Sequence, residues 1–118
     1  MAPSEFVRDM FNGYALTFDE SLKALRYQSP ELLRQAVDVL LARLPAQDAW
    51  AERGRRGEWR VFDGGCGTGL CGPLFRNLTR SLSGVDLSEN MVALARKRGV
   101  YNELAVAELV AALAQLNR

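Results

Sequence analysis

Hydrophobic residues recur at three- and four-residue spacing in the first half of the chain, and this period predicts helices. The clearest helix begins at Ser29, expected as the N-cap, places Pro30 at its first position and ends before Pro45. Its apolar stripe must pack on another element, and we expect that element to be a sheet. The stripe consists of Leu32, Leu33, Ala36, Val37, Leu40, Leu41 and Leu44.

Shorter helices are expected on either side of this one. Residues 4–12 can form a helix, and Thr17 and Glu20 fit a capping box that opens another. After Pro45, residues 47–53 can add a turn or two of helix, ended by Gly54 and Gly57. Residues 1–57 are therefore expected to form a helical segment.

The second half of the chain alternates between short apolar runs and helical patterns. Strands are expected at 58–62, at 81–85 and within 101–106. Each is followed by a helical pattern, which ends near 77, near 98 and near 116. This alternation predicts an α/β fold with a parallel sheet and right-handed crossovers.

A glycine-rich turn follows the first expected strand. Val61 and Phe62 lead into Asp63, and four of the next six residues are glycine. Glycine adopts positive φ angles and lets the backbone approach a ligand closely, while the first N–H groups of the following helix have no partner within the helix. We therefore expect a nucleotide-like ligand at this turn.

The residues of this turn resemble a known family motif. Asp63, Gly65, Gly67 and Gly69 form the pattern Asp-x-Gly-x-Gly-x-Gly, which closely resembles the first motif of the class I methyltransferases that use S-adenosylmethionine. The stretch 84–88, Gly-Val-Asp-Leu-Ser, matches the second motif of the same family. Tyr-Ala followed by Phe-Asp-Glu near the N-terminus resembles a segment found in small-molecule methyltransferases that are often fused to tetratricopeptide repeats.

The resemblance implies a Rossmann-like parallel sheet preceded by N-terminal helices. Residues 58–118 would supply the strands that lie in the order 3-2-1 in this family, so we expect a partial, truncated S-adenosylmethionine-binding domain. The strands that normally complete the sheet and form most of the acceptor site would be missing. On this interpretation the chain binds the methyl donor at best and does not turn over.

The resemblance also implies the residues that contact the donor. Asp86 would accept two hydrogen bonds from the ribose diol, although capping of the helix near Ser88 is an alternative. Glu108 would meet the adenine amino group or cap a helix, Leu87 and Met91 would cover the adenine or pack in the core, and Tyr14 would belong to a lid. The complete set is Asp63, Gly64, Gly65, Cys66, Gly67, Gly69, Asp86, Leu87, Met91, Glu108 and Tyr14.

A dinucleotide site is the main alternative. Residues 67–72 also spell G-x-G-x-x-G, and Asp86 follows Gly67 by nineteen residues, close to the spacing of a ribose-binding acid. Asp63 argues against this alternative, because a carboxylate repels a diphosphate but attracts the sulfonium and the ammonium of S-adenosylmethionine. An NAD-binding oxidoreductase fragment and a non-catalytic interaction module both stay open.

Composition narrows the remaining choices. The 118 residues are 48% hydrophobic and 25% charged with a net charge of +1, which fits one globular domain and gives no sign of a nucleic-acid or membrane partner. The absence of histidine excludes a histidine general base and, with two cysteines, the usual structural zinc sites. No signal peptide or membrane-spanning run is apparent, so we expect a cytoplasmic protein in which Cys66 and Cys71 are reduced packing residues.

The expected partners follow from the fold and the chemistry. The methyl acceptor is expected to be a small molecule, and the sulfonium of the donor is reactive enough that no protein nucleophile is needed. Without a further strand, the edge of the sheet beside Val61 is open and exposes unpaired backbone groups. We therefore expect a homodimer that covers this edge.

Overall fold

The computed structural model describes residues 5, 7–9, 12 and 28–116. Its centre is a three-stranded parallel sheet in the order β1-β2-β3. The strands are β1 (Trp59–Gly64), β2 (Thr79–Asp86) and β3 (Glu103–Val106). This sheet and its flanking helices confirm the expected Rossmann-like α/β architecture. The expected helix at 4–12 is only partly within the described residues, and the capping box at Thr17 and Glu20 lies outside them.

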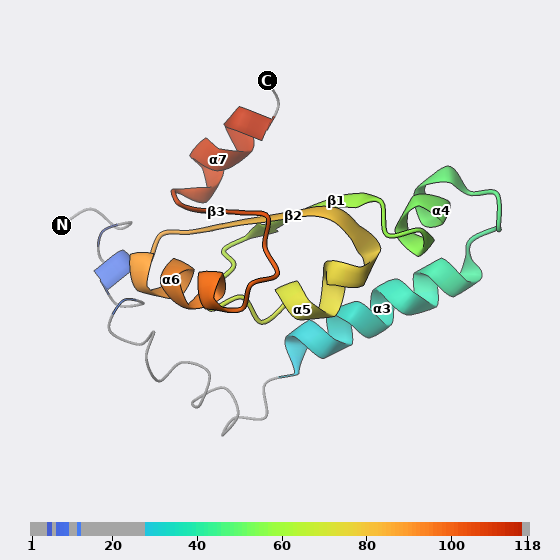
Figure 1. Ribbon diagram of the computed structural model, residues 1–118, viewed down its shortest axis with the longest axis horizontal. Coiled ribbons are helices and arrows are strands. Elements are labelled where there is room, and N and C mark those ends of the chain that lie inside the picture. The colour runs from blue at the N-terminus through green and yellow to red at the C-terminus, as the bar shows by residue number, and fades with distance from the viewer. Residues whose placement is uncertain (1–4, 6, 10–11, 13–27, 117–118) are drawn as a thin grey trace.

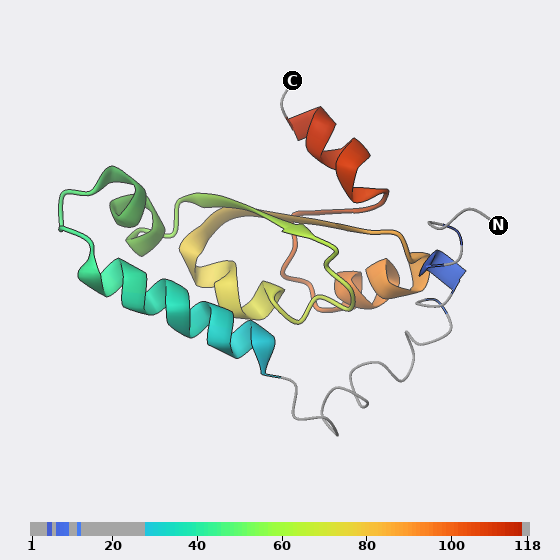
Figure 2. The same ribbon diagram turned by 180° about the vertical axis from the view of Figure 1, so that it is seen from behind.

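Helices lie on both sides of the sheet. Figure 1 shows α3, α5 and α6 on one side and α7 on the other, and the reverse view in Figure 2 agrees. The helices are α3 (Ser29–Arg43), α4 (Ala49–Arg55), α5 (Gly72–Phe75), α6 (Glu89–Lys97) and α7 (Leu109–Leu116), with the short 3-10 helix η1 (Arg76–Leu78) after α5. None of the helices in the described ranges is long and apolar enough to cross a membrane.

The register of the strands brings their carboxyl ends to one edge of the sheet. Asp63 of β1 pairs with Gly84 of β2, and Asp86 at the end of β2 pairs with Val106 of β3. Because all three strands run in the same direction, the loops that leave them meet at this edge. The acids that end β1 and β2 are therefore neighbours in space.

The main core cluster joins the early helices to β1. It consists of Leu41, Ala51, Trp59, Phe75 and Leu78. The Trp59 ring lies 4.4 Å from the Trp50 ring, centroid to centroid, and Trp59 Nε1 donates a 2.8 Å hydrogen bond to the Trp50 carbonyl. These contacts fix α4 against the start of the sheet.

The apolar stripe of α3 is only partly buried, so the expectation that the stripe packs on the sheet holds for only part of it. Leu41 is buried in the core cluster, and Val37 and Leu44 pack against that cluster. Leu33 and Leu40, by contrast, are about half exposed, at 53% and 45%. The physical reason is that no strand lies beyond β1 in the described part of the chain, so part of the helix has no sheet to cover.

Two helix boundaries also differ from the expectation. Gln28 rather than Ser29 is the N-cap of α3, so Ser29 is its first helical residue. Helix α4 continues through Gly54 and ends before Gly57, which has a φ of +71°. Gly54 serves packing instead, because a Cβ there would lie 2.4 Å from the Trp59 ring.

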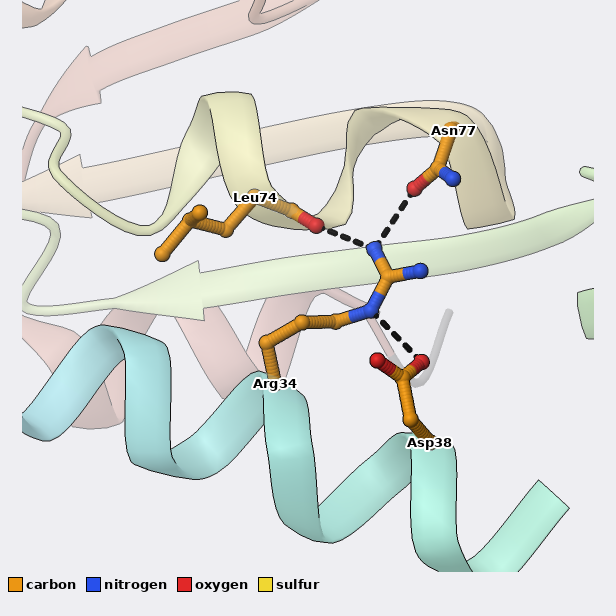
Figure 3. Close-up of polar contacts among 4 residues, drawn as sticks. All are labelled: Arg34, Asp38, Leu74 and Asn77. Atoms are coloured by element: carbon orange, nitrogen blue, oxygen red, sulfur yellow. Dashed lines mark hydrogen bonds and ion pairs between the residues drawn. The ribbon is translucent and has the colours of Figure 1, made fainter. Parts of the chain in front are cut away.

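Arg34 links α3 to the segment that connects β1 with β2 (Figure 3). Its Nη1 donates to the Leu74 carbonyl and, at 2.6 Å, to Asn77 Oδ1, while its Nε donates to Asp38 Oδ1 at 2.8 Å. The Leu74 carbonyl belongs to the short helix α5, where the end of the helix leaves carbonyls without a partner. A planar guanidinium satisfies several of these acceptors at once.

Replacing this guanidinium should destabilise the fold. We expect Arg34→Ala to lower the free energy of unfolding by about 2 kcal/mol, because two carbonyl-type acceptors lose a charged donor. Urea denaturation followed by circular dichroism measures the change. Arg43→Ala, an exposed arginine in the last turn of the same helix, is the matched control and should change stability by less than about 0.5 kcal/mol. Equal effects of the two variants would contradict this role of Arg34.

Candidate functional site

Two adjoining cavities lie at the carboxyl edge of the sheet. The first has a volume of about 220 Å³ and the second of about 320 Å³, and both are lined by Gly65 and Asp86. The first is also lined by Pro30, Asp63, Cys66, Gly67, Thr68, Leu70, Cys71 and Met91. The second is also lined by Val7, Val85, Leu87, Ala107, Glu108 and Leu109. Together they have the size of a small-molecule site.

Two glycines of the turn leave open space beside these cavities. Gly65 has a φ of +71° and Gly67 a φ of +55°, so both adopt the left-handed conformation that favours glycine. Nothing lies within 4 Å of the position that a Cβ would take at either residue. The backbone between β1 and α5 therefore presents a bare, concave surface.

The other two predicted glycines line neither cavity and serve packing. A Cβ at Gly64 would lie 2.7 Å from Leu109 Cδ1 of α7. A Cβ at Gly69 would lie 3.2 Å from the Cβ of Ala95 in α6 and 3.0 Å from the Tyr101 ring. The motif thus combines glycines that face the cavities with glycines that let α6 and α7 approach the sheet.

Asp86 connects the glycine turn to the start of α6. Its Oδ2 accepts a 2.9 Å hydrogen bond from the Gly67 N–H, and its Oδ1 accepts a 3.0 Å hydrogen bond from the Ser88 N–H. Ser88 itself caps α6 by accepting from the Met91 N–H at 3.2 Å, as the sequence predicted. Each carboxylate oxygen of Asp86 keeps a second lone pair, so the group can still accept hydrogen bonds from a ligand.

Asp63 lies in the first cavity, half-buried, with Tyr101 as its hydrogen-bond donor. The Tyr101 hydroxyl donates a 2.6 Å hydrogen bond to Asp63 Oδ2. Burial raises the pKa of Asp63, the bond from Tyr101 opposes this rise, and the charge of Asp86 adds to it. Two acids thus line one cavity without an arginine or lysine among its lining residues, which suits a cationic ligand.

The two cysteines are free thiols, as expected. Cys66 is buried in the first cavity, and burial together with the charges of Asp63 and Asp86 raises its pKa to about 12. Burial also raises the pKa of Cys71. Both thiols therefore stay protonated and unreactive near neutral pH.

The residues proposed for the adenine divide between the cavities. Leu87 and Glu108 line the second cavity together, whereas Met91 is buried and lines the first. Glu108 Oε1 accepts a 3.0 Å hydrogen bond from the Val110 N–H. Glu108 therefore caps the start of α7, which is the alternative role that the sequence offered for it. The structure brings Glu108 to the same cavity as Asp86, which spacing alone did not determine.

The N-terminal part of the chain reaches this edge through Asn12. Asn12 Oδ1 accepts from the Ser88 hydroxyl and from the Asn90 N–H, and the Asn12 carbonyl accepts from Asn90 Nδ2 at 3.2 Å. Tyr14, the predicted lid residue, lies outside the described residues. The contact nevertheless places the backbone two residues before Tyr14 at the N-terminus of α6.

Sequence reasoning missed three residues of the site. Pro30, Tyr101 and Asn12 come from an early helix, from the loop before β3 and from the N-terminal segment. No local pattern marks them, because their roles arise from contacts across 38 residues or more in the cases of Tyr101 and Asn12. Among the residues that the structure describes, no cluster of three or more acids or cysteines is arranged to hold a metal ion.

Comparison with known proteins identifies the domain. Residues 62–117 match the family model described as "Methyltransferase domain". These residues, just under half of the chain, are similar to class I methyltransferases. The methyltransferase match begins within β1 and includes the glycine turn and both acids that line the first cavity.

One curated relative supports the same family. Over 84 residues the chain is 34% identical to a malonyl-[acyl-carrier protein] O-methyltransferase of Enterobacter lignolyticus (strain SCF1). The matched stretch covers 71% of this chain but 30% of that relative. The match therefore spans less than a third of the length of that methyltransferase.

The raised pKa of Asp63 has a consequence for stability. At pH values above 3.8 but below its raised pKa, the folded protein holds a proton on Asp63 that the unfolded chain has released, so stability falls as pH rises through this window. We expect Asp63→Asn to raise the Tm at pH 7 by a few degrees, because it removes a half-buried charge while the amide oxygen still accepts from Tyr101.

Thermal denaturation at several pH values tests this expectation. The advantage of Asp63→Asn should disappear below pH 3.8, where Asp63 is protonated in both states. Glu103→Gln, which removes an exposed acid from β3, is the control and should not show this pH dependence. A variant Asp63→Asn that is less stable than the wild type at pH 7 would contradict the argument.

Proposed function

We propose that the chain provides the S-adenosylmethionine-binding part of a methyltransferase that acts on a small molecule. The observation that carries the proposal is the bare backbone at Gly65 and Gly67 beside two carboxylates, Asp63 and Asp86, in one cavity. A side chain at either glycine would fill the space that a ligand needs. The family match at residues 62–117 supports the same conclusion.

The cavities fit the chemistry of this donor from end to end. In the first, Asp63 suits the ammonium of the amino-acid end, and in the second, Leu87 and Glu108 suit the apolar face and the amino group of adenine. Asp86 lines both cavities, so it lies where the ribose would connect the amino-acid end of the donor to the adenine. We propose these roles together with the packing roles of Gly64, Cys66, Gly69 and Met91 around the site.

The structure favours this donor over a dinucleotide. A diphosphate beside Gly65 and Gly67 would meet Asp63 and Asp86 in the same cavity, and both carboxylates would repel it. Gly72, the last glycine of the G-x-G-x-x-G pattern, faces the Tyr101 ring, which a Cβ would approach to 2.6 Å. The pattern therefore has an explanation that involves no dinucleotide.

The protein's contribution to methyl transfer would be binding and orientation. When bound, S-adenosylmethionine supplies an activated methyl group on a positive sulfur. The carboxylates hold the amino-acid and ribose ends, the glycine turn admits the ligand to van der Waals distance, and Cys66, protonated and buried, adds no competing nucleophile. No side chain needs to form a covalent bond to the substrate.

The acceptor is proposed only as a class. The relative's name specifies O-methylation of a malonyl group on an acyl carrier protein, and we propose for this chain a small-molecule acceptor without a nucleic-acid partner. The free thiols support our proposal of a cytoplasmic location. We further propose that residues 1–57 cover the site and that residues 58–118 hold the donor.

We also propose a homodimer formed at the edge of β1. Within the described residues β1 pairs only with β2, so one side of its backbone has no neighbouring strand. Leu33 and Leu40 of α3 are about half exposed, and a hollow of about 680 Å³ lies along β1. Both aromatic and charged side chains line the hollow: Trp50, Trp59, Phe62 and Phe75 with Arg53, Glu58, Arg60 and Arg80. Such an unpaired edge beside exposed apolar side chains favours association.

Removing Asp86 should weaken donor binding. We expect Asp86→Ala to reduce the affinity for S-adenosylhomocysteine by about tenfold or more. The ribose would lose a charged acceptor, and the Gly67 N–H would lose its partner. Isothermal titration calorimetry measures the affinity. Glu89→Ala, an exposed acid in the first turn of α6, is the matched control and should bind like the wild type.

The same titration separates the alternatives. Binding of NADH without binding of S-adenosylhomocysteine would replace the proposal with a dinucleotide site. A folded protein that binds neither would favour a non-catalytic interaction module.

If the chain forms a dimer, its mass in solution should increase with protein concentration. We expect light scattering over a range of protein concentrations to show a shift from one chain to two, and hydrogen exchange to slow at the β1 amides as dimer forms. The amides of β3 serve as the internal control, because the proposed interface does not include them. A single-chain mass at the highest concentration would refute the dimer.

A further inference from the structure

The side chain of Tyr101 makes a hydrogen bond that neither the motifs nor the family match explains. It belongs to the loop between α6 and β3, yet its hydroxyl donates a 2.6 Å hydrogen bond to Asp63 at the end of β1. A hydrogen bond to a carboxylate is shorter and stronger than one between neutral groups. The contact therefore ties the loop before β3 to the acid of the glycine motif.

Three glycines form a slot that holds the Tyr101 ring. A Cβ at Gly72 would lie 2.6 Å from Tyr101 Cε1, a Cβ at Gly69 would lie 3.0 Å from the same atom, and a Cβ at Gly84 would lie 3.1 Å from Cε2. The glycines come from the turn, from α5 and from β2, so they surround the ring from separate elements. A ring packed this closely has little freedom to move its hydroxyl.

The hydrogen bond from Tyr101 uses one carboxylate oxygen of Asp63 and leaves the other available. Oδ2 accepts from Tyr101, and no residue in the described ranges donates to Oδ1. Asp63 is one of the residues that line the first cavity, between the glycine turn and Asp86. The bond to Tyr101 fixes the carboxylate while its second oxygen stays free to bind a ligand.

We propose that Tyr101 is a positioning residue that holds Asp63 as the acceptor for the ammonium group of the methyl donor. This inference rests on the proposed function. The hydroxyl also opposes the effects of burial and of the Asp86 charge, both of which raise the pKa of Asp63. Tyr101 thereby keeps Asp63 ionised at pH values where a partly buried acid beside a second carboxylate would otherwise bind a proton.

The substitution Tyr101→Phe tests the hydroxyl separately from the ring. Phenylalanine fills the same slot, so the packing of Gly69, Gly72 and Gly84 is retained. We expect the affinity for S-adenosylhomocysteine to fall about tenfold at neutral pH. We also expect the decrease of affinity at acidic pH to begin at a higher pH than in the wild type, because the pKa of Asp63 rises without the donated bond.

A second probe distinguishes positioning from general support of the fold. 5′-Methylthioadenosine contains the adenosine and the thioether but lacks the amino-acid end. Its affinity should be the same for the wild type and Tyr101→Phe. Asp63→Asn should lose affinity for S-adenosylhomocysteine alone and should abolish the acidic pH dependence. An equal loss for both probes, or no loss for either, would overturn the inference.

The outcomes also separate this inference from the function on which it rests. A wild type that binds neither probe overturns both proposals. A wild type that binds S-adenosylhomocysteine, with Tyr101→Phe binding equally well over the whole pH range, overturns only the role of Tyr101. Carbon NMR of the Asp63 carboxyl group adds a test without ligand, since the pKa of Asp63 must be higher in Tyr101→Phe than in the wild type.

Discussion

The parallel pairing of β1 with β2 is the constraint on which the rest of this structure depends. It brings the ends of both strands to one edge and sets Asp63 and Asp86 beside the same cavity. The hydrogen bond from the Gly67 N–H to Asp86 then closes the glycine turn over the end of β2. If the two strands were antiparallel, the acids would lie at opposite edges and no common site would exist.

The glycines of the turn show how one motif serves two physical needs. Gly65 and Gly67 adopt positive φ angles beside empty space, which leaves room for a ligand. Gly69 of the turn and Gly72 at the start of α5 instead face Tyr101, so they allow close packing that any side chain would prevent. The second role explains why the motif contains more glycines than the bare surface of the cavity requires.

Large apolar side chains of two helices remain exposed on the surface of the domain. Leu33 and Leu40 of α3 are about half exposed, and Val110 of α7 is 70% exposed. The sheet that these helices flank is three strands wide in the described residues. These apolar faces give the proposed dimer a physical basis.

The sequence by itself determined the strand–helix alternation, the glycine turn and the acids that end β1 and β2. These features depend on neighbouring residues, such as the apolar run into Asp63 and the Ser88 cap of α6, so periodicity and spacing reveal them. The exposed half of the α3 stripe and the role of Gly54 were not predictable in this way. They depend on where the sheet ends and on the distant Trp59 ring.

Only the tertiary structure decided how the site is completed. Tyr101 reaches Asp63 across 38 residues, Asn12 reaches Ser88 across 76, and Pro30 lines the cavity from a helix that precedes the sheet. None of these contacts leaves a local pattern in the chain, because each arises when separate elements pack together. Sequence therefore determined the backbone of the candidate site, and packing determined which side chains contact its acids.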